Sequence, residues 1–332
     1  MNQRDNILSL LNGQPRADVP AFSGLLHVTA AGLASEGLTW REVHHDARKM
    51  AQAAASTYRL TGLPSVTLPL DLTAPAEALG AELVFYSEDE FQFPQVKKAL
   101  VESARELTAE STEILKSGRI PLILDAIRLA KADVGGETVL SGLIPGPYTL
   151  LLYLCNPTKL FLEMRKSPQP VADALFHLSS ILAQIGQAYR AAGADYITIH
   201  EMGGSPGFLG PARFEKFVLP ALKELIGQLP APRVLSVCGN TNASMNLLAQ
   251  SGAEALSVDQ VNDLAASRAV LKDTLLFGNL DPLETISMGN AAQVGAAAAR
   301  TREAGVDAVW PGCDLLLQTP VKNIQALQPA KP

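Results

Sequence analysis

The sequence has few cysteines, few charged residues and no long uninterrupted apolar run. Its three cysteines are too few, and odd in number, for a disulfide framework. Lysine and arginine form no cluster along the chain, and the net charge of −6 argues against nucleic acid as a partner. The closest approach to a membrane span, 140–155, is interrupted by glycine and proline and is shorter than the roughly 18 residues required. The first residues lack the apolar segment of a signal peptide, so we expect a cytoplasmic protein without membrane contact.

No serine- or glycine-rich linker divides the chain, and hydrophobic residues make up 47% of it, which is enough for a sizeable core. Short apolar runs alternate with long helical patterns throughout. We predict eight strands, at 20–24, 65–70, 138–143, 196–200, 233–238, 254–259, 274–279 and 307–311. Eight strand–helix units in one chain predict a closed (β/α)8 TIM barrel.

The alternative α/β architecture is an open, doubly wound sheet. Such a sheet usually carries a glycine-rich phosphate fingerprint after its first strand, and residues 25–28 contain none. We therefore expect a single (β/α)8 barrel domain over residues 1–332. An N-terminal helical extension and a small extra hairpin near 82–90 are expected to lie outside the barrel.

Two cysteines lie at the C-terminal ends of predicted strands, where barrels of this kind place their active sites. Cys238 and Cys313 each lie beside a glycine, whereas Cys155 lies in an apolar helical stretch. A single cysteine there is most simply a small buried hydrophobe, but two at one face predict a pair of converging thiolates. We assign Cys238 and Cys313 as catalytic candidates and Cys155 as structural.

Two converging thiolates favour zinc, which cysteine, histidine and some carboxylates bind tetrahedrally. A site with three protein ligands and one open position can bind a substrate thiol. The ion then lowers the pKa of that thiol and holds it as a nucleophilic thiolate at neutral pH.

Motifs along nearly the whole chain carry a family resemblance. They are Arg4-Asp5-Asn6 with Gly13, Arg16 and Asp18-Val-Pro20, then Asp71-Leu72-Thr73 with 77–82, Gly142–Tyr148, Val237-Cys238-Gly239-Asn240, Gly278–Pro282, and Pro311-Gly-Cys-Asp314 with Thr319-Pro320. Together they resemble the uroporphyrinogen decarboxylase superfamily and, within it, the methylcobamide:coenzyme M methyltransferase branch. The resemblance implies a (β/α)8 barrel independently of the strand count.

The similar methyltransferases carry zinc on a His-x-Cys pair and a distant cysteine. The resemblance places the two cysteines at Cys238 and Cys313, but the histidine position is Ser236. A serine hydroxyl is a poor zinc ligand, so we expect His200 or Glu201, at the end of the neighbouring strand, to complete the set. Alternation along the strand allows only one of these two to point inward. His27 is a weaker candidate.

Further polar residues also follow predicted strands. Asp71, Asp259, Asn279 and Asp281 are expected to bind substrate or to orient ligands, although such residues also cap loops and turns. The glycine-rich segment 203–207 is expected over the barrel mouth, where its backbone amides suit an anionic group.

The resemblance implies methyl transfer from a methylated corrinoid protein to a small acceptor, with zinc as the ion that activates a thiol such as coenzyme M. The methylcobamide is expected on a partner protein, since no corrinoid-binding domain is evident. A uroporphyrinogen decarboxylase-like lyase is the second reading, weakened because 22–27 lacks the arginine-rich signature that an acidic porphyrinogen requires. A tetrahydrofolate-using methyltransferase and a non-catalytic corrinoid-binding paralogue also remain.

Overall fold

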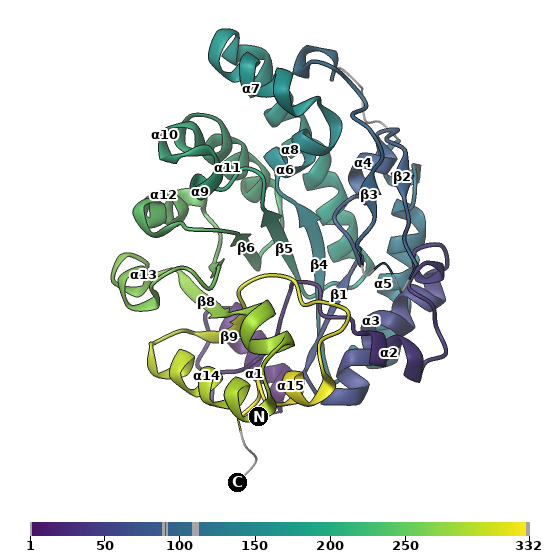
Figure 1. Cartoon of the computed structure of the whole chain (residues 1–332), viewed down its shortest axis with the longest axis vertical. Coiled ribbons are helices and arrows are strands. Elements are labelled where there is room, and N and C mark those ends of the chain that lie inside the picture. Colours follow the sequence, from purple (N-terminus) through teal and green to yellow (C-terminus); the bar gives the residue numbers. More distant parts are fainter. Residues whose placement is uncertain (1, 88–89, 91, 108–112, 330–332) are drawn as a thin grey trace.

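The structure is a computed structural model that describes residues 2–87, 90, 92–107 and 113–329. Its central sheet is parallel throughout and curls around one axis, with helices on its outer side (Figure 1). The strand order follows the chain: β1 (Ser65–Leu68), β4 (Val139–Pro145), β5 (Tyr196–Glu201), β6 (Arg233–Val237), β7 (Ala255–Val258), β8 (Leu275–Leu280) and β9 (Ala308–Pro311). The α/β barrel predicted from the alternating pattern is thus confirmed.

The segment at 20–24 closes the barrel without forming the predicted strand. Ala21 makes a single parallel bridge with Val309 of β9, through a 2.9 Å hydrogen bond from the Val309 amide to the Pro20 carbonyl. On its other side the Ser23 amide donates to the side-chain hydroxyl of Ser65 in β1 at 3.1 Å, instead of to a backbone carbonyl. The prediction of an eighth regular strand is therefore wrong, because side-chain bonding replaces the ladder on that side.

The helices surround the sheet and connect its strands (Figure 1). They are α1 (Gln3–Leu11), α2 (Ala30–Ser35), α3 (Ala47–Thr61), α4 (Ala74–Ala78), α5 (Ile120–Val134), α6 (Pro147–Leu154), α7 (Pro157–Lys166), α8 (Pro168–Ala192), α9 (Pro206–Leu209), α10 (Pro211–Arg213), α11 (Leu219–Gln228), α12 (Met245–Leu248), α13 (Leu264–Val270), α14 (Ala291–Glu303) and α15 (Val321–Gln325). Two π-helical turns, Phe214–Val218 and Pro282–Ser287, lie between them.

Two further segments lie outside the barrel wall. β2 (Leu83–Val84) pairs antiparallel with β3 (Gln95–Val96), so this pairing reaches beyond the region 82–90 in which we expected a hairpin. Residues 88 and 89 of that expected hairpin lie outside the described residues. Helix α1 contributes Ile7, Leu10 and Leu11 to the apolar cluster inside the barrel.

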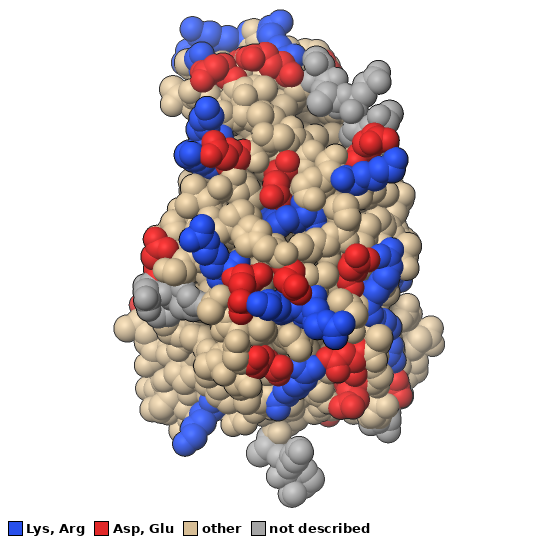
Figure 2. All heavy atoms as spheres, turned by 90° about the vertical axis from the view of Figure 1, so that its right-hand side faces the viewer, with Lys and Arg blue, Asp and Glu red and all other residues tan. Residues whose placement is uncertain are grey.

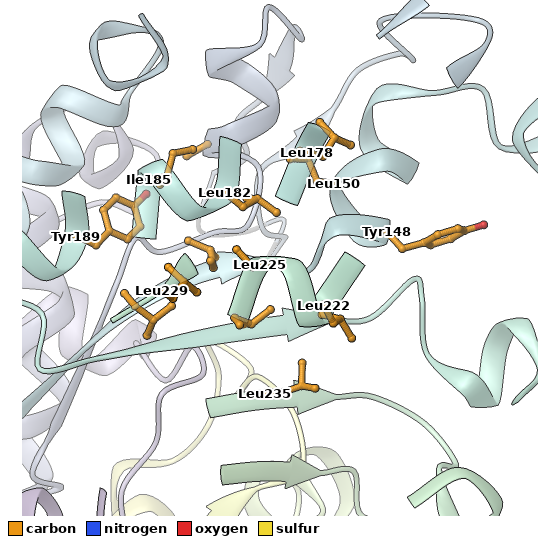
Figure 3. Packing of buried hydrophobic residues seen from close by; sticks show 14 of the residues in the cluster. Tyr148, Leu150, Leu178, Leu182, Ile185, Tyr189, Leu222, Leu225, Leu229 and Leu235 are labelled. Carbon is orange, nitrogen blue, oxygen red and sulfur yellow. The ribbon is translucent and has the colours of Figure 1, made fainter. Parts of the chain in front are cut away.

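Alternation along the strands separates an inner core from an outer one. In β5, Tyr196 belongs to the cluster inside the barrel, whereas Ile197 and Ile199 pack among the helices. The outer cluster includes the apolar stripe of α8, which faces α11 and Leu235 of β6 (Figure 3). A one-residue slip of register would exchange these two faces, so the pattern fixes which strand residues point inward.

We expect Phe22→Ala to destabilise the protein by about 3–5 kcal/mol, the usual range for removing a buried phenyl ring. Phe22 is 1% exposed, and its ring packs edge-on against Tyr196, Phe277 and Trp310, with centroids 5.2–6.2 Å away. Denaturant unfolding of the variant measures the change. Phe176→Ala is the matched control, because Phe176 is 42% exposed and its loss should change stability little. Equal effects of the two substitutions would contradict this account of barrel closure.

Candidate metal centre

Three side chains with metal-binding atoms meet where the barrel strands end. Nε2 of His200 lies 3.0 Å from Sγ of Cys238 and 4.0 Å from Sγ of Cys313, and the two sulfurs are 3.4 Å apart. His200 is fully buried, while both cysteines are partly exposed. The structure thus brings together the two cysteines and one of the two additional ligands that the sequence suggested.

Strand alternation explains why these residues meet. His200 shares the inward-facing parity of Tyr196 in β5, and Cys238 follows β6 with the parity of the inward-facing Val234. The register pairs His200 with Ser236, so His200 stands beside the position that the family resemblance gives to a histidine. Cys313 comes from the loop after β9, and that loop brings its sulfur back to the other two side chains.

The charges of these groups depend on one another. Hydrogen bonds from Cys238 and His200 hold the pKa of Cys313 well below its usual value, against the effect of burial. The neighbouring sulfur of Cys313, together with burial, raises the pKa of Cys238. The contacts within the cluster therefore make Cys313 the more acidic of the two thiols.

Asp314 is a part of this site to which the sequence analysis, although it quoted Asp314 in a family motif, gave no role. Its Oδ2 lies 3.7 Å from Nδ1 of His200, and its Oδ1 accepts a 2.8 Å hydrogen bond from the Leu26 amide. Burial lowers the pKa of His200, but Asp314 and Cys313 outweigh it and raise that pKa to about 9. Burial also raises the pKa of Asp314 to about 6. The position of Asp314 directly after Cys313 was the signal that could have identified it.

The donor set fits zinc. Two sulfurs and one imidazole nitrogen are typical zinc ligands, and zinc–ligand bonds of about 2.0–2.3 Å at tetrahedral angles place donor atoms roughly 3.6–3.8 Å apart. The three observed separations, 3.0, 3.4 and 4.0 Å, span that range. Nε2 is the ring nitrogen of His200 that faces the two sulfurs, while Nδ1 is buried and lacks a hydrogen bond among the described residues. Three protein ligands leave a fourth position open, as in catalytic zinc sites.

Glu201, the other suggested ligand, faces away from this cluster. Its carboxylate accepts hydrogen bonds from the backbone amides of Tyr148, Thr149 and Gly204, at 2.9–3.0 Å, and one from the Thr149 hydroxyl. Its outward parity in β5 places it against the start of α6, so the geometry does not support it as a ligand. The same bonds use the Gly204 amide, and the Thr149 hydroxyl takes the Gly203 amide, so neither of these amides is free for an anionic group.

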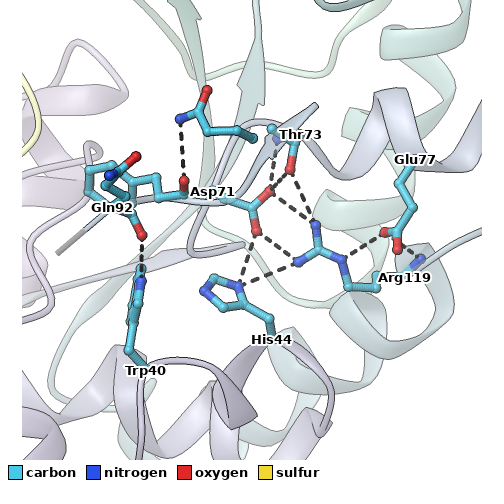
Figure 4. A network of polar contacts seen from close by, with 9 residues as sticks. Trp40, His44, Asp71, Thr73, Glu77, Gln92 and Arg119 are labelled. Atoms are coloured by element: carbon cyan, nitrogen blue, oxygen red, sulfur yellow. Dashed lines mark hydrogen bonds and ion pairs between the residues drawn. The ribbon is translucent and has the colours of Figure 1, made fainter. Parts of the chain in front are cut away.

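Asp71 lies in a separate buried ion network (Figure 4). Arg119 donates to both of its carboxylate oxygens, at 2.8 and 3.1 Å, and also to Glu77 at 2.7 Å. Nδ1 of His44 lies 3.3 Å from the same carboxylate. Burial acts to raise the pKa of Asp71, but Arg119 and His44 hold it well below its usual value. Asp71 is therefore an ionised, fully partnered group, and the sequence analysis missed its partner because Arg119 lies far along the chain.

The remaining candidates hold the loops of the barrel mouth. Asp259 accepts from the amides of Gly239 and Val261, and Asp281 accepts from those of Leu283 and Glu284. The side-chain amide of Asn279 donates to the backbone carbonyls of Asp259 and Asn262. The weaker histidine candidate, His27, uses both ring nitrogens on the carbonyls of Leu25 and Ser65 and lies outside the cluster.

The surface and the helices bear on the expectation that the protein binds neither nucleic acid nor a membrane. On the face shown in Figure 2, acidic and basic side chains are intermixed and form no patch of one sign. Within the described ranges, no helix combines the length and hydropathy needed to cross a membrane.

We predict that the protein binds one zinc ion, and that Cys238→Ala, Cys313→Ala and His200→Ala each weaken binding. Loss of a ligand should exceed the roughly 10–100-fold loss in affinity that follows removal of an outer partner. Competition against a chromophoric chelator measures the affinity. Cys155→Ala is the matched control, because the sulfur of Cys155 is buried outside the cluster.

A ligand exchange tests the placement of the histidine. Because His200 and Ser236 are paired in register, adding Ser236→His to His200→Ala should recover part of the lost zinc affinity. Unchanged affinity in all single variants would contradict the assignment of these ligands.

We predict that Arg119→Met destabilises the protein by about 3–5 kcal/mol, because it leaves the buried carboxylate of Asp71 without its cation. The double variant Arg119→Met with Asp71→Asn should lose less stability than Arg119→Met alone.

The stability that Asp71 supplies should depend on pH. The depressed pKa of Asp71 means that its ionised form stabilises the fold above the unfolded pKa of about 3.9, and that this contribution is lost as the pH falls through the folded pKa. The stability gap between the native protein and Asp71→Asn, measured by urea unfolding, should therefore shrink below about pH 4; a pH-independent gap would refute this.

Comparison with known proteins agrees with the geometry. The family model described as uroporphyrinogen decarboxylase matches residues 2–330. The chain is 28% identical to the methylcobamide:CoM methyltransferase MtbA of Methanosarcina acetivorans, over 98% of this chain and 96% of that protein. It is 30% identical to the methylcobamide:CoM methyltransferase MtaA of Methanosarcina barkeri, over 99% of this chain and 97% of that protein.

A solved structure resembles the whole chain. It is a methyltransferase from Methanosarcina mazei, with a TM-score of 0.94 and 28% sequence identity, and the match covers 98% of this chain and 97% of that one. The resemblance found in the sequence motifs is thus confirmed. The chain belongs to the uroporphyrinogen decarboxylase family and, within it, to the branch of methyltransferases.

Proposed function

We propose that this protein transfers a methyl group from a methylated corrinoid, carried by a separate protein, to a small thiol that is activated at the cluster of His200, Cys238 and Cys313. The observation that carries the proposal is the convergence of these three donor atoms within 4.8 Å at the barrel mouth. The relatives named as methylcobamide:CoM methyltransferases support the reaction class.

The chain's own residues define where the thiol reacts. His200, Cys238 and Cys313 would hold the zinc ion, and Asp314 lies beside the outer nitrogen of His200, where a carboxylate favours the tautomer with a free Nε2. When bound, zinc lowers the pKa of a coordinated thiol and keeps it as a thiolate at neutral pH.

The transfer itself is a nucleophilic displacement at carbon. The acceptor thiol gives up its proton to solvent, and its sulfur attacks the methyl carbon of methylcobamide. The sulfur–carbon bond forms as the cobalt–carbon bond breaks, and the electron pair of the broken bond stays on cobalt, which becomes Co(I). Cys238 and Cys313 are both partly exposed, which is consistent with access of a methylated corrinoid to the site. We expect this to take place in the cytoplasm, where thiols stay reduced.

The decarboxylase reading has less support. It would depend on Asp71 as the acidic group that faces a tetrapyrrole, but that carboxylate is buried and bonded to Arg119 and Thr73. A decarboxylation assay with uroporphyrinogen discriminates, because the lyase would lose activity with Asp71→Asn and not with the cysteine variants.

Two other readings lead to different outcomes in the same assays. A tetrahydrofolate-using enzyme would demethylate methylcobalamin with tetrahydrofolate and would not need the thiolate cluster. A non-catalytic paralogue would bind cobamide without turnover. Ser236 favours the paralogue only if nothing replaces the missing histidine, and His200 stands beside that position.

We predict that the zinc-loaded protein demethylates methylcobalamin in the presence of a small thiol, measured by the absorbance change of the corrinoid. Cys238→Ala and His200→Ala should lower kcat/KM by about 10²–10³-fold, because a metal that activates a nucleophile supplies several kcal/mol. Cys155→Ala should keep the native rate. If Cys238→Ala turned over as fast as the native protein, the proposed mechanism would be wrong.

A further inference from the structure

The segments that directly follow the closing segment and each strand contain acidic residues and no lysine or arginine. They cover 25–29, 69–73, 146, 202–210, 238–244, 259–263, 281–290 and 312–320. None of these described loops contains lysine or arginine, whereas Asp71, Asp259, Asp263, Asp281, Glu284 and Asp314 lie in them. An anion that enters the mouth therefore meets carboxylates of its own sign.

Backbone amides are the other way in which proteins bind anions, and here the chain's own carboxylates use them. The N-terminal amides of α6, at Tyr148 and Thr149, donate to Glu201. The same internal capping occurs at the amides of Leu26, Thr73, Gly204, Gly239, Val261, Leu283 and Glu284, which donate to Asp314, Asp71, Glu201, Asp259 and Asp281. These amides are therefore bonded within the protein and are not free to bind an anionic ligand.

Two arginines on neighbouring elements do not replace these amides. Arg119 contacts Asp71 after β1, but it is 6% exposed and its guanidinium is paired with Asp71 and Glu77. Arg213, at the end of α10, is exposed, and its guanidinium donates to the Leu209 carbonyl at 3.1 Å. Of these two arginines, only Arg213 has an exposed side chain that an anionic substrate could contact.

We propose that the acceptor is a thiol that is uncharged or carries an amino group, and that a thiol with an anionic tail is a poor acceptor. This inference rests on the proposed function and refines its substrate class. Two carboxylates adjoin the cluster: Oδ2 of Asp314 lies 3.7 Å from His200, and Oδ2 of Asp259 binds the amide of Gly239, next to Cys238. An ammonium group on the acceptor would be attracted by both, and a sulfonate would be repelled. Coenzyme M, named for the relatives MtbA and MtaA, carries a sulfonate, so the inference predicts for this chain an acceptor other than the one in their names.

Three thiols that differ only at one end test the inference: 2-aminoethanethiol, 2-hydroxyethanethiol and 2-mercaptoethanesulfonate. Their kcat/KM values with zinc-loaded protein and methylcobalamin, corrected for the thiolate fraction of each, should fall in that order by about tenfold or more from first to last. The difference should narrow at high salt, because ions screen exposed charges. Calorimetric titration of the zinc-loaded protein should give the same order of affinity without turnover.

A charge variant tests the cause. The side chain of Gln260 lies against Gly312, the residue before Cys313. Its Oε1 is 2.9 Å from the position that a Cβ atom on Gly312 would occupy. Gln260→Lys should therefore raise kcat/KM for the sulfonate and lower it for the amine, each by several-fold, with the hydroxyl compound nearly unchanged. Gln260→Met is the uncharged control.

Other results separate the failure of this inference from that of the proposed function. The inference would be overturned if the protein preferred the sulfonate thiol, or if Arg213→Gln selectively abolished turnover of the sulfonate thiol. Either result would leave the proposed function, methylation of a thiol, intact. No turnover with any thiol would overturn the proposed function, and the calorimetric order of affinity would still decide the inference.

Discussion

The convergence of one imidazole nitrogen and two sulfurs at the mouth of the barrel is the interaction on which the rest of this account depends. His200 and Cys238 come from adjacent parallel strands and Cys313 from the loop after β9, so no local motif could bring them together. Their meeting depends on the inward parity of β5 and β6, which the burial of Tyr196 and Val234 inside the barrel fixes. A slip of one residue in β5 would turn the imidazole out and bring Glu201 in.

The loops around the cluster are held by carboxylates, and this has a consequence for substrate choice. Asp259, Asp281 and Asp314 each cap backbone amides of the mouth, so the groups that stiffen the loops also give the entrance its negative character. The buried pair of Asp71 and Arg119 belongs to the same pattern, since Asp71 takes up the guanidinium of a buried arginine. The same carboxylates thus hold the loops in place and carry the negative charge on which the proposed selectivity depends.

The sequence predicted the parts of the site that periodicity controls. Strand ends are visible in the alternation of apolar residues, so Cys238, Cys313 and His200 could be placed at one face before any coordinates were known. The choice between His200 and Glu201 required the parity of β5 in the barrel. Arg119 was missed as the partner of Asp71 because the two meet only through a tertiary contact far apart in the chain. Asp314 was missed as the partner of His200, although it directly follows Cys313 in the sequence. The prediction of a regular strand at 20–24 was wrong, because the Ser23 amide bonds to the side-chain hydroxyl of Ser65 and not to a backbone carbonyl of β1.

X-ray absorption at the zinc edge of the loaded protein tests the central claim most directly, because it counts the atoms bound to the ion. The account predicts two sulfur ligands at about 2.3 Å and one imidazole nitrogen at about 2.0 Å, plus a fourth ligand that becomes a third sulfur when a thiol is added. A spectrum without sulfur ligands, or one that does not change when the thiol binds, would contradict it.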